Sequence, residues 1–582
     1  LSKYKMNYFH WHLTDDQGWR IEIKSHPELQ KISAWRNGTR IGHYSSLPEK
    51  YDTVRYGGYY TQDEIRQVVR YAAQRHVTVV PEIEMPGHAL AALAANPQLS
   101  CTGGPFQTAR TWGVFPDVYC TREETFTFMN DVLKEVCSLF PGPYVHIGGD
   151  ECPKERWKAC ANCQAVIKRE KLKDEHELQS WFVRRIGKIL EANGKKMIGW
   201  DEILEGGLAP DATVMSWRGY QGGIDAARQA HDVIMTPTSY CYFDYYQSRN
   251  PGEPLAIGGY LPIEKVYSFE PVPAELSKDE AKHILGAQGN LWTEYILNLS
   301  MAEVAVLPRM CALAEVVWSP RQQRDYDRFM TRLYSHLKML QFQGLSYSKA
   351  VYDVVMTVKP DNGKGLSIAL STPYKNGLIR YSLSEELPNG NSPVYTEPFK
   401  IDQSLAIRTK VFDGTMEKGN LLSQIFRVNY ATGKDVILVN RPDDEYCTGG
   451  GFTLVNGLTG ALPWNGSDWL GFRGKSLDAT VDLGSVMGFS KVALDALNDE
   501  GSWIHFPKSV EVQLSDDGKN FTSVAKLSGE KLDPSKRQIR VPVGKAKARY
   551  VKIIAENAGV IPEGKPGAGN PAWLFADEII IE

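Results

Sequence analysis

The sequence contains no apolar run of about 18 residues or more, so a membrane-spanning helix is not expected. Its net charge of −3 and pI near 6.5 give no general attraction to nucleic acid or to anionic membranes. The chain begins LSKYKMNYFHWH, without an initiator methionine and without the charged and then apolar segment of a secretion signal. We therefore expect a truncated beginning, which carries no information on localisation.

A second CxxC motif is also missing. Cys160 and Cys163 form a lone CxxC, whereas a second such pair would indicate zinc. A local disulfide or free thiols are therefore favoured over a metal at this pair, and no cofactor is expected. The nine cysteines are an odd number, so at least one has no partner within the chain.

Length and composition indicate a globular protein of several domains. The 582 residues are too many for one ordinary domain. The 42% of hydrophobic and 23% of charged residues are typical of globular proteins, so disorder is not expected. The 14 Trp and 28 Tyr offer aromatic faces that can stack on sugar rings, although core packing accounts for most of them.

Residues 1–345 alternate strand-like and helix-like patterns. TQDEIRQVVRYAAQRH has Thr61 and Glu64 in capping-box spacing and apolar residues at helical intervals. A second capping box, Thr121 with Glu124, predicts the start of another helix. Short apolar strands separate the helical stretches: VTVVPEIEM, YVHIGGDE, KKMIGWDE, ATVMSWRG, DVIMTPTSY and ILGAQGNLWTE. This alternation is typical of a buried parallel sheet.

Polar and aromatic residues recur where these strands end, at Asp15, Glu84, Asp150, Glu151, Trp200, Trp217 and Glu294. The active site of a (β/α)8 barrel lies at the C-terminal ends of its strands. The predicted fold class is therefore α/β, with a (β/α)8 TIM-type barrel over residues 1–345. Together with the strand-like run that opens the chain, about seven strand units are found, whereas closure needs eight. We predict that the missing unit is the first, lost with the truncated beginning.

After about residue 345 the pattern changes to short alternating strands separated by turn signals. Residues 355–435 lack helical periodicity, and residues 436–582 are similar but richer in Gly and Trp. Short strands at such spacing predict all-β sandwiches. Two sandwich domains, 355–435 and 436–582, are therefore expected to follow the barrel.

The stretch YVHIGGDEC places two acids, Asp150 and Glu151, side by side. Neighbours on a strand normally point to opposite faces, but Gly148 and Gly149 favour a bulge that lets both carboxyls reach the barrel mouth. Many sugar-cleaving enzymes place two carboxyls on opposite sides of the glycosidic bond, but Asp150 and Glu151 would lie too close together for that. In an N-acetylated sugar the acetamido oxygen can itself attack the anomeric carbon. Glu151 would then be the general acid, and Asp150 would hold the acetamido N–H.

HIGGDE resembles the signature of glycoside hydrolase family 20, the β-N-acetylhexosaminidases. Further segments are similar to that family's motifs in the family's order, and together they cover nearly all of residues 1–345: NYFHWHLTDDQGWRIEI, PEIEMPGHA, GWDE, SYCYFDYY and GAQGNLWTEY. The resemblance implies an exo-acting enzyme. It would remove terminal GlcNAc or GalNAc from glycans, with retention, through an oxazolinium intermediate.

The resemblance also implies the roles of individual residues. Glu151 would be the acid/base and Asp150 the acetamido-orienting residue, with Asp15 and His88 as a relay that tunes Glu151. The pocket would be walled by Trp200, Trp217 and Trp292, Tyr242 would bond the acetamido oxygen, and Asp244 and Glu294 would bind sugar hydroxyls. The family also carries an arginine on its first barrel strand, which is not assigned to a position here because that strand is expected to be missing with the truncated beginning. No metal ligand is expected.

The appended domains carry likenesses of their own. Residues 355–435, with IRYSLSEELPNGNSPVYTEPF, resemble the chitobiase C-terminal domain. Residues 436–582, with DWLGFRGKSLDATVDLG and FADEIIIE, resemble a discoidin-like, coagulation factor 5/8 type C sandwich. Such sandwiches often bind glycans, so a glycan substrate and a glycan ligand of the last domain are the expected partners. By analogy, we expect a periplasmic or extracellular setting.

Three alternatives remain open. A disaccharide-releasing family member, such as a lacto-N-biosidase, would need a wider pocket. A non-catalytic glycan-binding protein would account for the missing strand and the appended sandwiches. His10 and His12 share one strand face and could serve a metal-dependent hydrolase, although histidines hydrogen-bonded in the barrel core are favoured.

Overall fold

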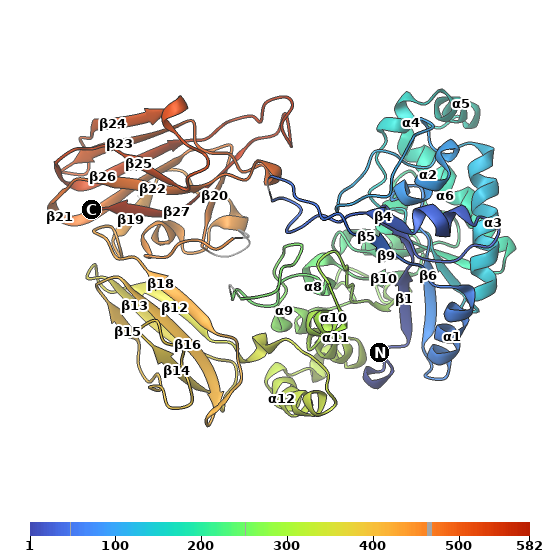
Figure 1. Cartoon of the computed structure of the whole chain (residues 1–582), viewed down its shortest axis with the longest axis horizontal. Helices are drawn as coiled ribbons and strands as arrows, with labels where there is room; N and C mark the ends of the chain where they lie inside the picture. Colours follow the sequence, from blue (N-terminus) through green and yellow to red (C-terminus); the bar gives the residue numbers. More distant parts are fainter. Residues whose placement is uncertain (47, 251, 463–467) are drawn as a thin grey trace. The chain divides into compact units, whose positions relative to one another are not determined.

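A computed structural model describes residues 1–46, 48–250, 252–462 and 468–582. The chain divides into two compact units. The first comprises Leu1–Tyr245, Leu255–Ile257 and Leu261–Tyr347, and it contains the parallel sheet and the α-helices. The second comprises Tyr246–Pro254, Gly258–Tyr260 and Ser348–Glu582, and its regular structure is mainly antiparallel β-sheet (Figure 1).

Seven strands form the central sheet of the first unit, in the order β1-β6-β7-β8-β9-β10-β11. Each strand pairs in parallel with the next member of this series. The strands are β1 (Tyr8–His12), β6 (Thr78–Glu82), β7 (Tyr144–His146), β8 (Lys196–Trp200), β9 (Thr213–Ser216), β10 (Val233–Met235) and β11 (Ile284–Ala287).

Strands β1 and β11 are the two edges of this sheet, and within the described ranges no ladder joins them. The sheet is therefore a half-barrel of seven parallel strands in the order of a TIM-type barrel, as the seven strand units in the sequence indicate. That the eighth, absent unit is the first one stays a prediction.

Helices α1 to α9 lie between successive strands of the sheet along the chain, and α10 to α12 follow β11. They are α1 (Gln62–Ala73), α2 (Leu90–Ala95), α3 (Glu123–Leu139), α4 (Glu155–Ala159), α5 (Ala161–Glu170), α6 (Glu175–Ala192), α7 (Gln221–Arg228), α8 (Thr238–Cys241), α9 (Ile263–Tyr267), α10 (Leu299–Val306), α11 (Arg309–Trp318) and α12 (Tyr326–Phe342) (Figure 1). Two short hairpins, β2 (Thr14–Asp15) with β3 (Gly18–Trp19) and β4 (Trp35–Asn37) with β5 (Arg55–Gly57), follow β1.

One of the two predicted capping boxes is confirmed and the other is wrong. At α1, the Glu64 backbone N–H donates to the Thr61 hydroxyl and the Glu64 carboxylate accepts from the Thr61 backbone. Helix α3 instead begins after Arg122 without a side-chain cap. The Thr121 hydroxyl donates to the Cys163 sulfur, 3.3 Å away, so a tertiary contact takes it from the helix end.

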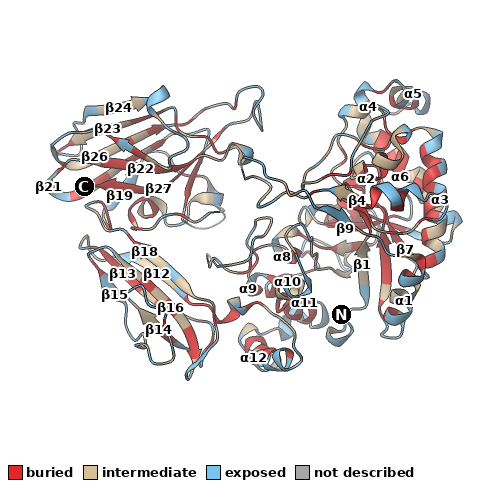
Figure 2. Ribbon diagram, viewed as in Figure 1, coloured by how far each residue is buried: buried red, intermediate tan, exposed pale blue. Residues whose placement is uncertain are grey.

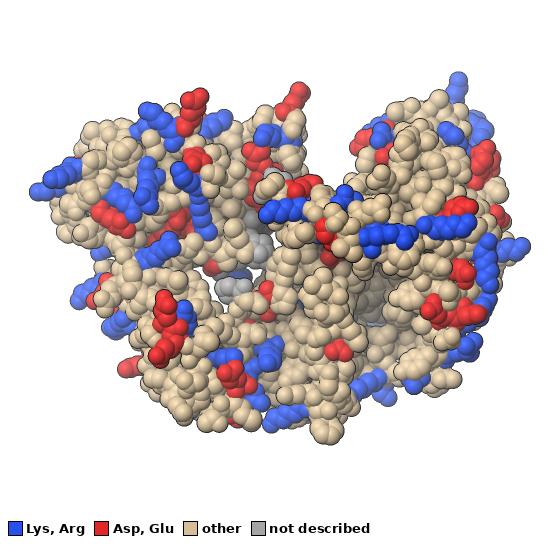
Figure 3. Space-filling view, viewed as in Figure 1, with Lys and Arg blue, Asp and Glu red and all other residues tan. Residues whose placement is uncertain are grey.

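Burial follows the sequence pattern. The four residues Val79–Glu82 of β6 and all four of β9 are buried, as expected for a sheet covered on both faces (Figure 2). Helices α3 and α6 bury one apolar face each and expose the other. Among the described residues, no helix is both long and apolar enough to cross a bilayer. Basic and acidic side chains are interspersed on the face shown in Figure 3.

Residues 355–426 form two small antiparallel sheets, in agreement with the all-β prediction. One has the order β12-β13-β15, and the other joins β14, β16 and β17, with β18 paired to β16. The strands are β12 (Val355–Pro360), β13 (Leu366–Ser371), β14 (Leu378–Ser382), β15 (Phe399–Ile401), β16 (Leu405–Asp413), β17 (Met416–Glu417) and β18 (Leu422–Phe426).

The last domain is a sandwich of a five-stranded and a four-stranded antiparallel sheet, ordered β19-β21-β26-β23-β24 and β20-β27-β22-β25. An apolar cluster from both sheets forms its core, including Phe472, Val481, Val512 and Ile579. The strands are β19 (Asp435–Leu438), β20 (Leu470–Arg473), β21 (Leu477–Phe489), β22 (Val492–Leu497), β23 (Ser509–Ser515), β24 (Thr522–Ser528), β25 (Gln538–Val541), β26 (Ala546–Glu556) and β27 (Trp573–Ile581).

Candidate active site

The adjacent acids lie on a tight turn directly after β7. Gly148, Gly149 and Glu151 have φ angles of +69°, +94° and +42°. Glycine is required at position 148, because a Cβ there would lie 1.7 Å from the buried Glu84 carboxylate. Glu151 adopts a left-handed conformation that non-glycine residues rarely take, which is typical of functional positions. The chain therefore leaves the strand alternation, as the two glycines predict.

His88 brings Asp15, Asp150 and Glu151 together. On one side of its ring, Nδ1 lies 3.2 Å from Asp15 Oδ1 and 3.0 Å from Asp16 Oδ2. On the other side, Nε2 lies 3.6 Å from Asp150 Oδ2 and 3.6 Å from Glu151 Oε2. His88 is itself left-handed, with φ +47°. Two neighbouring carboxylates thus converge on a single nitrogen atom from the same side.

Asp16 is a residue that the sequence reasoning missed. Its side chain is fully buried, and besides its contact with His88 it accepts a hydrogen bond of 2.8 Å from the Leu90 backbone at the start of α2. Asp15 is more exposed, and its Oδ1 accepts from the Asp16 backbone N–H. Two adjacent aspartates, Asp15 and Asp16, are visible in the sequence, but only their burial in the structure tells them apart.

The charges in this cluster are strongly interdependent. Burial opposes charging of His88, yet the carboxylates of Asp150 and Asp15 outweigh it and raise the pKa of His88 well above its usual value. Burial raises the pKa of Asp150 well above that of an ordinary carboxyl. Burial also disfavours charge on Asp15, but its hydrogen bond with His88 lowers the pKa below the usual value. His88 therefore favours the cationic form. Its positive charge in turn favours the charged form of the Asp150 carboxyl and offsets part of the penalty of burial.

Four aromatic residues come together beside the acids. The rings of Trp200 and Trp292 lie 6.1 Å apart, those of Trp292 and Tyr242 6.4 Å, and those of Tyr242 and Trp217 6.4 Å. Trp200 ends β8, and the other three follow β9, α8 and β11. They therefore come from successive strand ends, the place predicted for pocket walls.

Two buried carboxylates hold these indole rings. The Trp200 Nε1–H donates to Glu82 Oε1 at 2.9 Å, and the Trp217 Nε1–H donates to Glu202 Oε2 at 2.9 Å. Burial raises the pKa of Glu202 to about 7. The sequence reasoning did not assign either acid, although both lie in motifs that it singled out. Each fixes the plane of an aromatic ring.

Asp244, Glu294 and Asn290 add polar groups to the same region. Asp244 Oδ1 and Asp150 Oδ1 are buried and have no hydrogen-bond partner among the described residues. Burial raises the pKa of Asp244 to about 8. Tyr242 shares a side-chain hydrogen bond with Asn290. Buried polar atoms without partners are rare, and here they mark positions suited to a polar ligand.

A cavity of about 260 Å³ lies next to these residues in the first unit. Asp15, Trp292 and Glu294 line it together with Arg20 and Arg36. Arg20 donates to the backbone carbonyls of Ala34, Gly58 and Gln17, so it supports the surrounding loops. The cavity offers both an aromatic wall and carboxylates, a combination suited to sugars.

His10 and His12 both face the barrel-core acids. His10 Nε2 lies 2.9 Å from Glu82 Oε2, and His12 Nε2 lies 3.2 Å from Glu84 Oε1. His146 Nδ1 contacts the other oxygen of Glu82 at 2.9 Å. His10 Nδ1 is also hydrogen-bonded to Gln288 at 3.0 Å. The His12 contact with Glu84 is likewise a hydrogen bond, in agreement with the interpretation as hydrogen-bonded core histidines.

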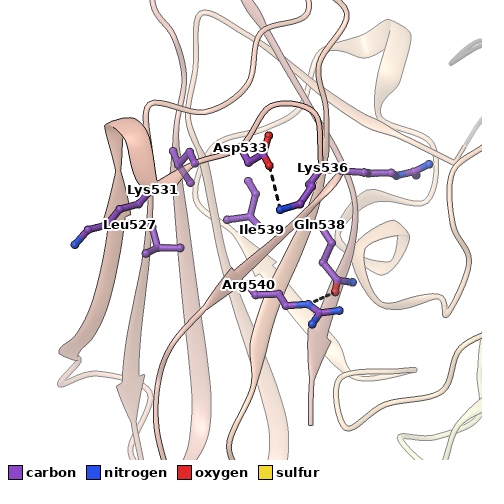
Figure 4. A pocket seen from close by; sticks show the side chains of 9 residues that line it. Leu527, Lys531, Asp533, Lys536, Gln538, Ile539 and Arg540 are labelled. Carbon is purple, nitrogen blue, oxygen red and sulfur yellow. Dashed lines mark hydrogen bonds and ion pairs between the residues drawn. The ribbon is translucent and has the colours of Figure 1, made fainter.

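A second cavity, of about 680 Å³, lies in the last domain between β24 and β25 (Figure 4). Lys536 contacts Asp533 at 3.1 Å, and Arg540 donates to Gln538 at 2.8 Å. Its described lining consists of Leu527, Lys531, Leu532, Asp533, Lys536, Arg537, Gln538, Ile539 and Arg540. None of these is aromatic, so this cavity lacks the flat surface on which sugars commonly stack.

A half-barrel with acids and aromatic rings at its strand ends defines the class, a TIM-barrel-like protein with a carbohydrate-type site. The family model "Glycosyl hydrolase family 20, catalytic domain" matches residues 1–321, more than half of the 582 residues. The chain therefore belongs to glycosyl hydrolase family 20. The F5/8 type C domain model matches residues 451–565, which confirms the likeness predicted for the last domain.

Similar proteins carry matching names. A beta-hexosaminidase of Porphyromonas gingivalis is 46% identical over 428 residues, covering 72% of this chain and 53% of the relative. One of Vibrio furnissii is 40% identical over 321 residues, covering 54% and 52%. The chain thus spans about half the length of these curated relatives. Among solved structures, the exo beta-N-acetylglucosaminidase of Vibrio harveyi in complex with N-acetylglucosamine is 38% identical, with a TM-score of 0.53, covering 60% of this chain and 55% of that one.

Proposed function

We propose that this chain is the catalytic part of an exo-acting β-N-acetylhexosaminidase that uses a substrate-assisted, retaining mechanism. The observation that carries the proposal is the convergence of Asp150 and Glu151 on one nitrogen of His88. Acids that approach the same atom from one side cannot flank an anomeric carbon from opposite faces. The nucleophile must then come from elsewhere, and the acetamido oxygen of the substrate supplies it.

In the first step, the acetamido oxygen attacks the anomeric carbon while the bond to the leaving oxygen breaks. Glu151 donates its proton to that oxygen. Positive charge develops on the acetamido nitrogen, and the Asp150 carboxylate accepts its N–H. Burial disfavours charge on Asp150 in the free protein. The developing cation relieves this penalty, so the contact strengthens in the transition state and lowers the barrier.

In the second step, the Glu151 carboxylate takes a proton from water as the water oxygen adds to the anomeric carbon. The oxazolinium ring opens, and the configuration is retained after two inversions. Cationic His88, held by Asp15 and Asp16, stabilises the carboxylate form of Glu151 between the two steps.

The remaining roles follow from position. Trp200, Trp217 and Trp292 would wall the acetamido pocket, and Tyr242 would donate its hydroxyl to the acetamido oxygen. Asp244 and Glu294 would bind sugar hydroxyls, and the Oδ1 atom of Asp244, which has no hydrogen-bond partner among the residues that the structure describes, supports this role.

The first test compares a chromogenic β-GlcNAc glycoside with the matching β-glucoside, which lacks the acetamido group. Cleavage of only the β-GlcNAc glycoside is expected. Cleavage of both would contradict substrate assistance. Cleavage of neither by the full-length protein would favour a non-catalytic glycan-binding function instead.

Two substitutions separate the roles of the acids. Glu151→Gln should slow hydrolysis of substrates with poor leaving groups by about 10³-fold and affect activated phenolic substrates less, because only the former need protonation. Asp150→Asn should slow both classes, because the attack of the acetamido oxygen accompanies the departure of either leaving group. Equal loss for both classes in Glu151→Gln would reverse the assignment.

The appended F5/8 type C domain supports a setting in which glycans are bound outside the cytoplasm, and we propose a periplasmic or extracellular location and a glycan ligand for this domain. Cell fractionation tests the first proposal, and a glycan-binding array of the full-length protein tests the second. Recovery in the cytoplasmic fraction, or an array without bound glycans, would contradict them.

A further inference from the structure

Four cysteine sulfurs from three separate segments converge in the first unit. They are Cys101, which follows the turn after α2, Cys120, in the loop before α3, and Cys160 and Cys163, at the start of α5. The four sulfur atoms all lie within 4.8 Å of one another. The CxxC that stands alone in the sequence is therefore completed by two distant cysteines.

Three of the six sulfur separations match the edge of a tetrahedral metal site. They are 3.7 Å between Cys101 and Cys163, 3.8 Å between Cys120 and Cys160, and 3.6 Å between Cys120 and Cys163, and the other pairs lie within 4.8 Å. Four sulfurs placed about 2.3 Å from a central zinc ion in a regular tetrahedron are about 3.8 Å apart. A disulfide needs about 2.05 Å, and all nine cysteines are free.

Hydrogen-bond donors point at the sulfurs, as they do around metal-bound thiolates. The Thr121 hydroxyl donates to Cys163 at 3.3 Å, and the Asn162 amide donates to Cys120 at 3.6 Å. The Arg122 side chain also interacts with Cys120. Zinc with four thiolates carries a net charge of −2, and a neighbouring guanidinium together with these donors offsets it.

The surroundings exclude water from most of the cluster. Cys120, Cys160 and Cys163 are buried, with Cys163 fully so, and Cys101 is half-buried. Val118, Trp157, Val166 and Leu178 pack around them. An apolar shell disfavours isolated thiolates, and a metal ion bound by all four sulfurs would stabilise their charged form.

We propose that Cys101, Cys120, Cys160 and Cys163 bind one structural zinc ion. Soft thiolates select zinc over the hard divalent cations, and four protein ligands leave no position open for catalysis. This inference goes beyond the proposed function and does not depend on it.

The zinc site ties together the loops that carry the active-site groups. The Tyr119 backbone N–H donates to the Pro86 carbonyl at 3.0 Å, two residues before His88. The Trp157 Nε1–H donates to the Tyr119 carbonyl at 2.9 Å, and Cys152, next to Glu151, packs in the same apolar cluster. Cross-linking at Cys120 and Cys160 thus fixes the segments after β6 and β7 relative to each other.

The test is the metal content of the purified full chain by elemental analysis. About one zinc per chain is expected in the wild type and in Cys137→Ser, a control in α3 outside the cluster, and less than about 0.1 in Cys120→Ser. Zinc present equally in both variants, or absent from the wild type, would overturn the proposal. Iron or copper in place of zinc would overturn the choice of metal.

Wild-type protein alone gives a second readout if Cys120→Ser does not fold. A mercurial thiol reagent should release the zinc in step with modification of four thiols, detected with a metallochromic dye. Replacement by cobalt should produce the intense visible bands of a tetrahedral thiolate site. Zinc release that precedes any thiol modification, or a thiol count lowered by two disulfides, would overturn the proposal.

Discussion

The requirement for glycine at position 148 gives the sharpest prediction. In Gly148→Ala the new Cβ would lie 1.7 Å from Glu84 Oε2, whereas ordinary contacts begin near 3.4 Å. Moving Glu84 aside is costly, because its side chain is buried and its Oε1 atom contacts His12 at 3.2 Å. If Glu84 keeps its place, the turn that carries Asp150 and Glu151 shifts by about 1.7 Å, the difference between the two distances.

A displacement of about 1 Å at reacting groups costs about 100-fold in rate. We therefore expect kcat of Gly148→Ala for a chromogenic β-GlcNAc glycoside to fall by about 100-fold or more. Thermal unfolding followed by circular dichroism should show that the fold is retained, with the melting temperature lowered.

Gly194→Ala is the matched control. Gly194 has nearly the same φ angle, +70° against +69° for Gly148, but no heavy atom lies within 4 Å of the position of its Cβ. Both variants share a backbone strain of about 1–2 kcal/mol, and only Gly148→Ala adds the clash. A kcat for Gly148→Ala within about threefold of that for Gly194→Ala would refute the close approach to Glu84 as the constraint on the acid pair.

Three further predictions concern other parts of the first unit. Thr61→Ala removes the α1 capping box and should lower the free energy of unfolding by about 1 kcal/mol in denaturant titrations; an unchanged value would contradict the cap. Asp244 has its pKa raised by burial from 3.8 to about 8, so the folded state binds a proton that the unfolded state has lost, and stability should fall as the pH rises through this window. Asp244→Asn should flatten that dependence, and a parallel pH profile of melting temperature would contradict it. Trp217→Phe keeps an aromatic wall but leaves Glu202 without its indole donor, which should cost about 1–2 kcal/mol of stability; a large rise in KM with unchanged stability would instead assign the indole N–H to the substrate.

The periodic features were readable from the sequence. Strand and helix alternation predicted the seven parallel strands, because a sheet covered on both faces needs continuous apolar runs, and Thr61 with Glu64 predicted the start of α1. Gly148 and Gly149 predicted the break that brings adjacent acids to one side, since positive φ angles are a local property of glycine. Such features depend on neighbours in the chain.

Other features depend on contacts between distant segments, and only the tertiary structure decided them. Asp15 and Asp16 are equivalent in sequence, yet burial makes Asp16 the closer partner of His88. Thr121 has the spacing of a helix cap, but its hydroxyl is taken by Cys163, 42 residues along the chain. No local pattern encodes a partner at such a separation, because the partner is chosen by how the strands and loops pack.

The cysteines show this division most clearly. The sequence by itself showed only that Cys160 and Cys163 are three residues apart, which favoured a disulfide or free thiols; the structure places them one turn apart at the start of α5. Cys101 and Cys120 reach them because the loops after β6 and before α3 fold over the start of α5, an arrangement set by long-range packing around Trp157. The order of residues along the chain does not specify which cysteines meet. Nor does it specify the 3.6–3.8 Å separation of three of the sulfur pairs, because both are set by the packing of the fold.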